Sequence, residues 1–201
     1  MPAKGKFIVF EGCDGSGLST CSRMFADYLR GKGYDVLLTK EATDSVVGST
    51  IKNVFLKGDE KLSPLALQLL FCADRANHLE IDIEPALSQG RIVVCDRYVL
   101  STLAFGSLGC DLSFLKKVNA DFRKPDLIFV IDVPTEVSLE RIQRTRGGTE
   151  LFEKLETLKK VRANYFKLKS YFKNTFIVNN NRPLDEASQE IKKIAGKVLK
   201  L

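Results

Sequence analysis

The stretch that decides the fold reads Phe7-Ile8-Val9-Phe10-Glu11-Gly12-Cys13-Asp14-Gly15-Ser16-Gly17-Leu18-Ser19-Thr20. Its first four residues form an apolar run typical of a buried strand. A glycine-rich turn follows, with Gly12 and Gly17 at the spacing of a phosphate-binding loop, and a helical pattern begins directly after it. Backbone N–H groups of such a loop, together with the positive end of the helix, bind an anionic phosphate chain. Residues 12–20 therefore predict a nucleotide site.

One position of this loop departs from the motif. Leu18 stands between Gly17, the last glycine, and the hydroxyl residues Ser19 and Thr20. A phosphate-binding loop has lysine at this position. The rest of the loop keeps its chemistry, because Ser19 can supply a hydroxyl to Mg²⁺ and Ser16 can donate a further hydrogen bond to a phosphate. The loop thus predicts nucleotide binding, while Leu18 raises the question of how phosphoryl transfer would proceed without that lysine.

Length and composition indicate one globular domain over residues 1–201. The chain is 44% hydrophobic and 28% charged, which is an ordinary balance for a folded protein. No apolar run approaches the roughly 20 residues that cross a bilayer, and the first residues lack the apolar segment of a signal peptide. We expect a cytoplasmic protein that is not bound to a membrane.

Charge and cysteine content leave few other classes of function. The net charge of +6 and the pI near 9.0 suit phosphorylated small molecules as well as nucleic acid. No DNA- or RNA-binding motif accompanies the basic residues, so we expect no nucleic-acid polymer as a partner. The five cysteines form no CxxC pair and the chain has one histidine, which argues against a zinc site. Cys72 and Cys95 are expected to be buried, and Cys13 to be a small residue tolerated in the loop.

Strand and helix patterns alternate along the chain. Short apolar runs at 7–10, 35–39, 91–95, 126–133 and 175–178 are typical of parallel strands buried on both faces. Helical patterns fit 18–31, 63–79, 98–121 in two pieces, 134–145, 152–172 and 183–200. We expect a three-layer α/β domain with a parallel five-stranded sheet.

Candidate chemistry gathers where the predicted strands end, since ligands of such sheets bind beyond the carboxyl ends of the strands. Asp96 there can orient Mg²⁺ through water, and Arg97 can reach a transferring phosphoryl group. On the helix at 63–79, Phe71 and Arg75 are four residues apart and share a face. They can stack on a base and hydrogen-bond its edge, although the pair taken alone favours Phe71 as a core residue and Arg75 as a surface one.

Several segments together resemble the thymidylate kinase family. The phosphate loop is similar to the family's DGSGKST. The run Leu70-Phe71-Cys72-Ala73-Asp74-Arg75-Ala76-Asn77-His78 resembles its LLFAADRAxH helix, and Asp96 to Phe105 its DRYxxSxxAY segment. Lys124 to Pro134 matches the PDLxxxLDVP strand, Val161 to Tyr165 the VRxxY helix, and Asn181 to Leu184 a late loop on the adenine side. The similarity runs in order over nearly the full chain, and it implies the phosphate-loop nucleoside monophosphate kinase fold.

The resemblance implies transfer of the γ-phosphoryl group of ATP to dTMP, with Mg²⁺ as cofactor. By position, Phe71 would stack on thymine, Arg75 would hydrogen-bond its edge and Thr102 would contact the base. Phe105 would disfavour a ribose 2′-hydroxyl, and Arg97 would lie between the two phosphates. The implied dTMP-binding set is Asp14, Glu41, Phe71, Arg75, Arg97, Ser101, Thr102 and Phe105. The implied ATP-binding set is residues 12–20 with Arg141 and Arg182, and the metal ligands are Ser19 and Asp96.

The chain departs from the family at three places. Leu18 removes a cation, the family's TREP turn reads Thr39-Lys40-Glu41-Ala42, and the usual Asp-Arg pair of the lid, about residues 142–153, reads Glu150-Leu151. We expect Arg144 or Arg146, acting with Arg97, to replace part of the missing charge when the lid closes. Asp14, Arg97, Arg144 and Arg146 form the implied catalytic set.

Three hypotheses follow from the sequence. The chain is an active thymidylate kinase with a modified loop, a related kinase acting on another nucleoside monophosphate or a deoxynucleoside, or a nucleotide-binding regulatory protein that has lost turnover. Leu18 and Leu151 favour the third, whereas Asp14, Arg75 and Arg97 oppose it. The resemblance also implies a homodimer.

Overall fold

A computed structural model describes residues 5–57, 62–146 and 151–200, with side chains described over 5–53, 62–144 and 155–200. Within this part of the chain, five strands form one parallel sheet in the order β2-β3-β1-β4-β5. Their bounds are β1 Lys6–Gly12, β2 Val36–Lys40, β3 Ile92–Asp96, β4 Leu127–Asp132 and β5 Thr175–Asn179. The predicted fold class and all five predicted strands are confirmed.

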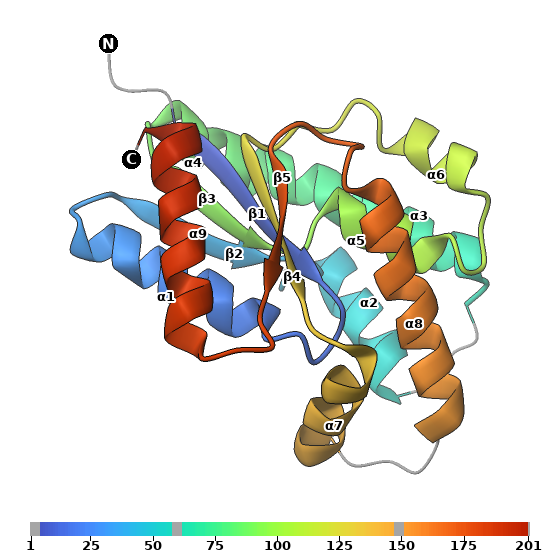
Figure 1. The fold of residues 1–201 in the computed structure, drawn as a ribbon. Coiled ribbons are helices and arrows are strands. Elements are labelled where there is room, and N and C mark those ends of the chain that lie inside the picture. The colour runs from blue at the N-terminus through green and yellow to red at the C-terminus, as the bar shows by residue number, and fades with distance from the viewer. Residues whose placement is uncertain (1–4, 58–61, 147–150, 201) are drawn as a thin grey trace.

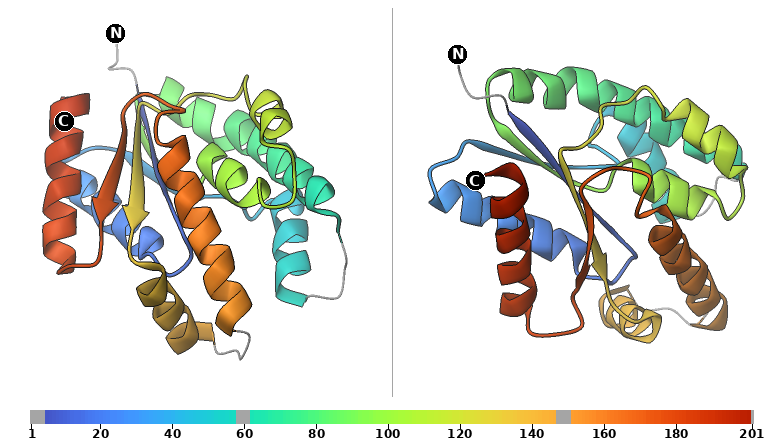
Figure 2. Two further views of the ribbon diagram at one scale, coloured as in Figure 1. Left: turned by 45° about the vertical axis from the view of Figure 1, so that its right-hand side comes forward. Right: turned by 45° about the horizontal axis from the view of Figure 1, so that its top comes forward.

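Helices cover both faces of the sheet (Figure 1), and two rotated views show the same three layers (Figure 2). One face carries α1 and α9, and the other carries α3 to α6 together with α8. Beyond the carboxyl ends of the strands lie α2 and α7. The bounds are α1 Leu18–Gly31, α2 Val46–Lys57, α3 Pro64–His78, the π-helix η1 Leu79–Ile83, α4 Glu84–Ser88, α5 Val99–Gly106, α6 Leu112–Val118, α7 Thr135–Arg146, α8 Leu151–Leu168 and α9 Leu184–Leu199.

The strands form because their side chains are apolar on both faces. In β1, Phe7 and Val9 belong to the core beneath α4, α5 and α8, whereas Ile8 and Phe10 belong to the core beneath α1 and α9. All four side chains are fully buried. Since β1 pairs with both β3 and β4, it occupies the centre of the sheet. The loop that follows β1 is therefore anchored to the most buried strand.

The structure differs from the predicted helices in one additional helix and in two helix ends. Helix α2 was not predicted, because its sequence contains Gly48 and several β-branched residues that weaken a helical pattern. Ser45 nevertheless stabilises its start by accepting a hydrogen bond from the Gly48 N–H. The helix predicted at 63–79 ends at His78 and continues through η1 into α4, and the helix predicted to reach residue 172 ends at Leu168. Among the described residues, no helix is long and apolar enough to cross a membrane.

Candidate functional site

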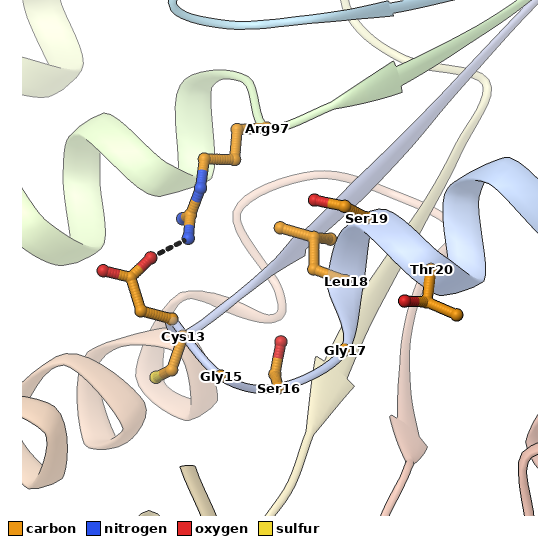
Figure 3. Close-up of a pocket in the computed structure, with 9 residues that line it drawn as sticks. Cys13, Gly15, Ser16, Gly17, Leu18, Ser19, Thr20 and Arg97 are labelled. Carbon is orange, nitrogen blue, oxygen red and sulfur yellow. Dashed lines mark hydrogen bonds and ion pairs between the residues drawn. The ribbon is translucent and has the colours of Figure 1, made fainter. Parts of the chain in front are cut away.

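The phosphate loop lies between β1 and α1 and lines a cavity of about 230 Å³ (Figure 3). Nine residues surround this cavity, and eight of them come from the loop and the first turn of α1. They are Cys13, Asp14, Gly15, Ser16, Gly17, Leu18, Ser19, Thr20 and Arg97. The structure thus brings Arg97, from the turn after β3, to the loop that the sequence identified as a nucleotide site.

The inner side of the loop is built to bind an anion. Helix α1 spans 14 residues and begins here, so its first N–H groups and the positive end of its dipole face the cavity. The Ser16 side chain is 1% exposed, and its Oγ has no hydrogen-bond partner among the described residues. A buried hydroxyl without a partner costs free energy, and a phosphate oxygen would supply that partner.

The outer side of the loop is held by residues from late in the chain. Asn180 Nδ2 donates to the Ser16 carbonyl at 2.7 Å, and Arg141 Nη1 donates to the Gly15 and Ser16 carbonyls at 3.4 Å. The backbone also packs tightly, because a Cβ added at Gly15 would lie 2.3 Å from the Ser138 carbonyl oxygen. Gly15 and Gly17 both have positive φ, at 74° and 86°, which glycine adopts without strain. The loop shape therefore depends on α7 and on the segment after β5.

Leu18 belongs both to the cavity and to the core. Its side chain is 5% exposed and joins the apolar cluster of β1, α1 and α9. In Figure 3 it points from the start of α1 toward the side of the loop where Arg97 lies. A leucine here supplies packing and no charge, so a cation near the phosphates must come from another residue.

Arg97 is the basic side chain that lines the cavity. Its Nη2 donates to Asp14 Oδ1 at 2.7 Å, and its Nη1 donates to the Gly12 carbonyl at 2.9 Å and to Ser101 Oγ at 3.1 Å. The guanidinium carbon lies 5.2 Å from the centroid of the Phe105 ring. Burial opposes the charge of Arg97, but the nearby carboxylates of Asp14 and Glu11 outweigh it, and its pKa is raised. Arg97 therefore stays protonated.

Glu11 is a buried carboxylate beneath Arg97 that the sequence reasoning did not assign to the site. Its Oε1 accepts from the Tyr98 backbone N–H at 3.0 Å, and its Oε2 accepts from Ser101 Oγ at 2.5 Å and from the Tyr165 hydroxyl at 3.3 Å. Burial raises the pKa of Glu11 from 4.5 to about 6, while the hydrogen bond from Ser101 and the charge of Arg97 oppose part of that rise. A glutamate inside an apolar strand was the available signal.

Arg75 lies in a second buried polar cluster beside the sheet. Its Nε and Nη2 donate to Glu41 Oε2 at 3.0 and 2.7 Å, its Nη1 to Asn119, and its Nη2 also to Thr102 Oγ1 at 3.1 Å. Arg75 is 1% exposed, and its guanidinium lies 4.9 Å from the centroid of the Tyr98 ring. Three of the residues that were predicted to bind dTMP are thus in direct contact, namely Arg75, Glu41 and Thr102.

Other residues that were predicted to bind dTMP lie around this cluster. Phe71 is half-buried on α3, one turn before Arg75, and Phe105 is half-buried on α5 between Arg97 and the Tyr165 ring. Asn119 was missed because it comes from the end of α6, 44 residues from Arg75 in sequence. His78 was missed as well, and its Nδ1 lies 3.3 Å from Glu41 Oε1. His78 holds the Glu41 carboxylate from the side opposite Arg75.

The arginines that were predicted to bind ATP or to belong to the lid lie apart from one another. Arg141 lies behind the phosphate loop, as described above, and Arg182 pairs with Glu190 on α9. Arg144 is exposed and pairs with Glu140, one turn earlier on α7. The side chain of Arg146 and residues 147–150 of the predicted lid lie outside the described part of the chain. Of the predicted lid arginines, the structure therefore describes the side chain of Arg144.

One predicted metal ligand lies at the start of α1, and the other lies at the end of β3. Ser19 is exposed at the start of α1 and lines the cavity, and Asp96 is the half-buried last residue of β3. The described residues contain no group of three or more acidic, cysteine or histidine side chains that could hold a metal ion on their own. Mg²⁺ commonly takes one or two protein ligands and completes its shell with water and substrate phosphates. A hydroxyl and a carboxylate fit that mode of binding.

The cysteines are packing residues. Cys72 and Cys95 are buried, as predicted, and Cys13 is 8% exposed although it lines the cavity. Burial raises the pKa of Cys13 to about 12, so its thiol stays protonated at neutral pH. Its position in the loop therefore does not make it a reactive residue.

Comparisons with known proteins give one consistent result. A family model described as thymidylate kinase matches residues 10–191. A probable thymidylate kinase of Pyrococcus horikoshii is 43% identical over 194 residues, which are 94% of this chain and 94% of that protein. A probable thymidylate kinase of Thermococcus onnurineus is 40% identical over 92% of this chain and 94% of its own length. A thymidylate kinase of Ruegeria pomeroyi is 37% identical over 96% of each.

Proposed function

The chain belongs to the thymidylate kinase family, and from that membership we propose that it transfers the γ-phosphoryl group of ATP to dTMP, giving ADP and dTDP. The observation that carries this proposal is the cavity at the phosphate loop. It combines a helix N-terminus, the buried Ser16 hydroxyl without a described partner, and the charged Arg97 side chain. These are the groups that a transferring phosphoryl needs, because phosphoryl transfer depends on alignment and charge neutralisation.

The donor nucleotide occupies the loop in this proposal. Backbone N–H groups of residues 12–20 and the Ser16 hydroxyl bind the ATP phosphates, and Arg141 and Arg182 contact the nucleotide from the adjoining segments. The contacts of Arg141 and Asn180 with the loop carbonyls support this role, since they leave the loop N–H groups directed inward. Ser19, with Asp96 acting through water, would hold Mg²⁺ on the phosphates. The ion would supply positive charge on the phosphate oxygens.

The acceptor nucleotide approaches from the Arg75 side. Phe71 stacks on thymine, and Arg75 and Thr102 hydrogen-bond its edge in the proposed complex. Glu41 and Ser101 hold the two arginines in place, as their contacts with Arg75 and Arg97 support. Asp14 approaches the 3′-hydroxyl of dTMP or the metal region, and Phe105 packs near the sugar, where its bulk disfavours a 2′-hydroxyl.

Arg97 lies between the two phosphates in this arrangement. A dTMP phosphate oxygen attacks the γ-phosphorus, the bond to the β,γ-bridging oxygen of ATP breaks, and ADP leaves with that oxygen. No general base is needed, because the attacking oxygen is already anionic at neutral pH. Arg97 neutralises charge on the transferring group and keeps donor and acceptor in line.

The charge lost at Leu18 is supplied from outside the loop in this proposal. Arg97 provides part of it, and Arg144 or Arg146 adds the rest when residues 142–153 close over ATP. Arg144 is suited to move, because it is 75% exposed and its partner Glu140 is 57% exposed. An exposed i,i+4 pair is worth a few tenths of a kcal/mol, so its loss on closure costs little.

The direct test is ADP release by the purified protein with ATP and Mg²⁺. The acceptors dTMP, dUMP, dCMP, dGMP and AMP are compared under the same conditions. We expect turnover that depends on dTMP and exceeds turnover with each other acceptor by about tenfold or more. Turnover with a different acceptor would change the proposed specificity. No turnover with any of them, despite measurable binding of ATP and dTMP, would overturn the proposed activity.

We also propose that the protein is a homodimer. Two leucines on one side of α3, Leu65 and Leu69, are 44% and 43% exposed, and Leu108 and Phe114 are 42% and 39% exposed. Gly109 packs against Pro64, so the segment after α5 lies beside the start of α3. Light scattering on the purified protein, as it leaves a size-exclusion column, should give about twice the chain mass of 22.5 kDa. A monomer mass at micromolar concentration would contradict this.

A further inference from the structure

Arg97 is held in an unusual backbone position by a buried carboxylate. It has φ of 71°, a left-handed conformation that is unfavourable for a non-glycine residue unless its surroundings hold it. The next residue, Tyr98, donates its backbone N–H to Glu11 Oε1, and the Arg97 N–H donates to the Phe10 carbonyl at 2.8 Å. Both bonds tie the turn after β3 to the end of β1.

The same carboxylate also reaches the Arg97 guanidinium through one hydroxyl. Ser101 Oγ donates to Glu11 Oε2 and accepts from Arg97 Nη1. Because its one hydrogen goes to Glu11, the Ser101 oxygen is left with lone pairs for the arginine. Tyr165 Oη lies 2.9 Å from Ser101 Oγ and 3.2 Å from the Gly12 carbonyl oxygen, which also accepts from Arg97. Glu11 thus sets both the backbone and the side chain of Arg97.

We propose that Glu11 is a positioning residue that fixes the Arg97 guanidinium for phosphoryl transfer, through the Tyr98 N–H and the Ser101 hydroxyl. The inference rests on the proposed function for its kinetic consequence, but the geometry is independent of that function. Arg97 matters more here than in a loop with lysine, since Leu18 carries no charge and Arg97 is the basic residue of the cavity lining. If the Arg97 guanidinium were displaced, the transferring phosphoryl group would lose the positive charge that Arg97 supplies.

Glu11 also links this positioning to pH. As a carboxylate it accepts both the Ser101 and the Tyr98 hydrogen bonds, whereas a protonated Glu11 would have to donate one bond and would lose its attraction to Arg97. Its pKa of about 6 places this change within the range of a kinetic assay. The titratable groups that face Glu11 are Arg97 and Tyr98 from the turn after β3, Cys95 from β3, Arg75 from α3 and Tyr165 from α8.

The kinetic test compares Glu11→Gln with the unmodified enzyme. The amide has the same shape but reverses the hydrogen bond to Ser101 and removes the charge. We expect kcat to fall about tenfold while KM for ATP and dTMP changes less than about twofold, because the fixed guanidinium matters most in the transition state. In the unmodified enzyme, protonation of Glu11 should lower activity below about pH 6. This fall should be absent from the variant. Unchanged kcat and pH profile would overturn the proposal.

A double-mutant cycle shows whether Glu11 acts through Arg97. In an Arg97→Lys background, Glu11→Gln should lower kcat by less than about twofold, since the forked hydrogen bonds are already lost. An independent further tenfold loss would show that Glu11 acts by another route. Glu84→Gln is the matched control, because it removes the charge from another carboxylate–arginine pair, with Arg123, away from the cavity. It should leave kcat unchanged.

A spectroscopic readout keeps the inference separate from the activity. The side-chain N–H signals of Arg97, identified by their loss in Arg97→Lys, should exchange with water at least about fivefold faster in Glu11→Gln. Glu84→Gln should leave them unchanged. Unchanged exchange in Glu11→Gln would overturn the positioning role whether or not the enzyme turns over. An inactive wild-type enzyme with faster Arg97 exchange in Glu11→Gln would instead overturn the proposed function alone.

Discussion

Leu18 shows how one residue can serve the core and the site at once. The same side chain that lines the cavity packs against the apolar cluster of β1, α1 and α9. A leucine buried to this degree is stabilising by about 1.5–3 kcal/mol relative to an exposed one. The protein thus gains packing at the position where a phosphate loop ordinarily has a cation. Stability and catalysis should respond in opposite directions when this residue is changed.

The first prediction concerns Leu18→Lys. A lysine there would add a cation beside the phosphates, and we expect kcat with dTMP to rise about tenfold, because the proposed arginines replace only part of the missing charge. Loss of apolar packing should lower the free energy of unfolding by about 1–3 kcal/mol. Steady-state kinetics and chemical denaturation measure the two effects.

Leu18→Met is the matched control for this substitution. It keeps the volume and adds no charge, so it should leave kcat within about twofold and stability within about 1.5 kcal/mol. A Leu18→Lys enzyme with unchanged or lower kcat would contradict the idea of partial replacement, because a lysine at this position of a phosphate-binding loop reaches the phosphates.

Residues of the site differ in how far the sequence could reveal them. The loop from Gly12 to Thr20 could be found because its residues are contiguous and their spacing has a physical meaning. Arg97 could be found because it comes two residues after the end of a predicted strand. Asn119 and Tyr165 could not, since their partners Arg75 and Gly12 lie 44 and 153 residues away and no local pattern encodes such pairings.

At the scale of elements, α7 extends from the phosphate loop toward the segment that we propose as a lid. Its first half packs on the loop, where the Ser138 carbonyl contacts Gly15 and Arg141 contacts the carbonyls of Gly15 and Ser16. Its second half carries Arg144 outward into solvent. One helix therefore holds the loop at one end and presents a lid arginine at the other. A movement of α7 on nucleotide binding would affect both.

The second prediction tests the lid arginine. Arg144→Ala should lower kcat about tenfold if Arg144 supplies part of the missing charge, because removing one transition-state contact typically costs that much or more. The melting temperature should stay the same, since exposed ion pairs contribute little to stability. Enzyme assays and calorimetry on the same preparation give both values.

Arg30→Ala provides the comparison for this variant. Arg30 is also partly exposed and also pairs with an acidic residue on its own helix, Asp27, but it lies in the last turn of α1, away from the cavity. It should retain full activity. Full turnover by Arg144→Ala would exclude Arg144 and leave Arg146 as the candidate.

Elements were predicted well where their sequence pattern was uniform. Each of the five strands is built around a short apolar run, so their positions agreed with the structure to within a few residues. Helix α2 was missed because Gly48 and its β-branched neighbours give a weak helical pattern, and what stabilises it is tertiary. Asp74 on α3 accepts from the Thr43 N–H at 2.8 Å and from Ser45 Oγ at 2.9 Å, which holds the segment that leads into α2.

At the scale of the whole molecule, Glu11 lowers stability at neutral pH. Its pKa is about 6 in the folded protein against 4.5 when exposed, so the folded state binds a proton more readily than the unfolded chain. Between those two pH values the folded state holds more protons, and stability therefore falls as pH rises. A shift of about 1.5 pKa units corresponds to roughly 2 kcal/mol.

The third prediction follows from that sign. The free energy of unfolding of Glu11→Gln minus that of the unmodified protein should increase by about 1.5 kcal/mol between pH 4.5 and pH 6.5, because glutamine cannot titrate. Chemical denaturation at several pH values measures this difference, and groups shared by both proteins cancel in it. A difference that stays constant with pH would mean that Glu11 is not buried as described.

The contact between Asn180 and the Ser16 carbonyl joins residues 164 positions apart. A ribosome makes the phosphate loop long before it makes the Asn180 side chain that holds the outer face of the loop. The nascent chain should therefore be unable to bind ATP tightly until Asn180 has been added. Arrested chains that end before Asn180 should accordingly gain no protection from proteolysis when ATP is added, whereas full-length chains should.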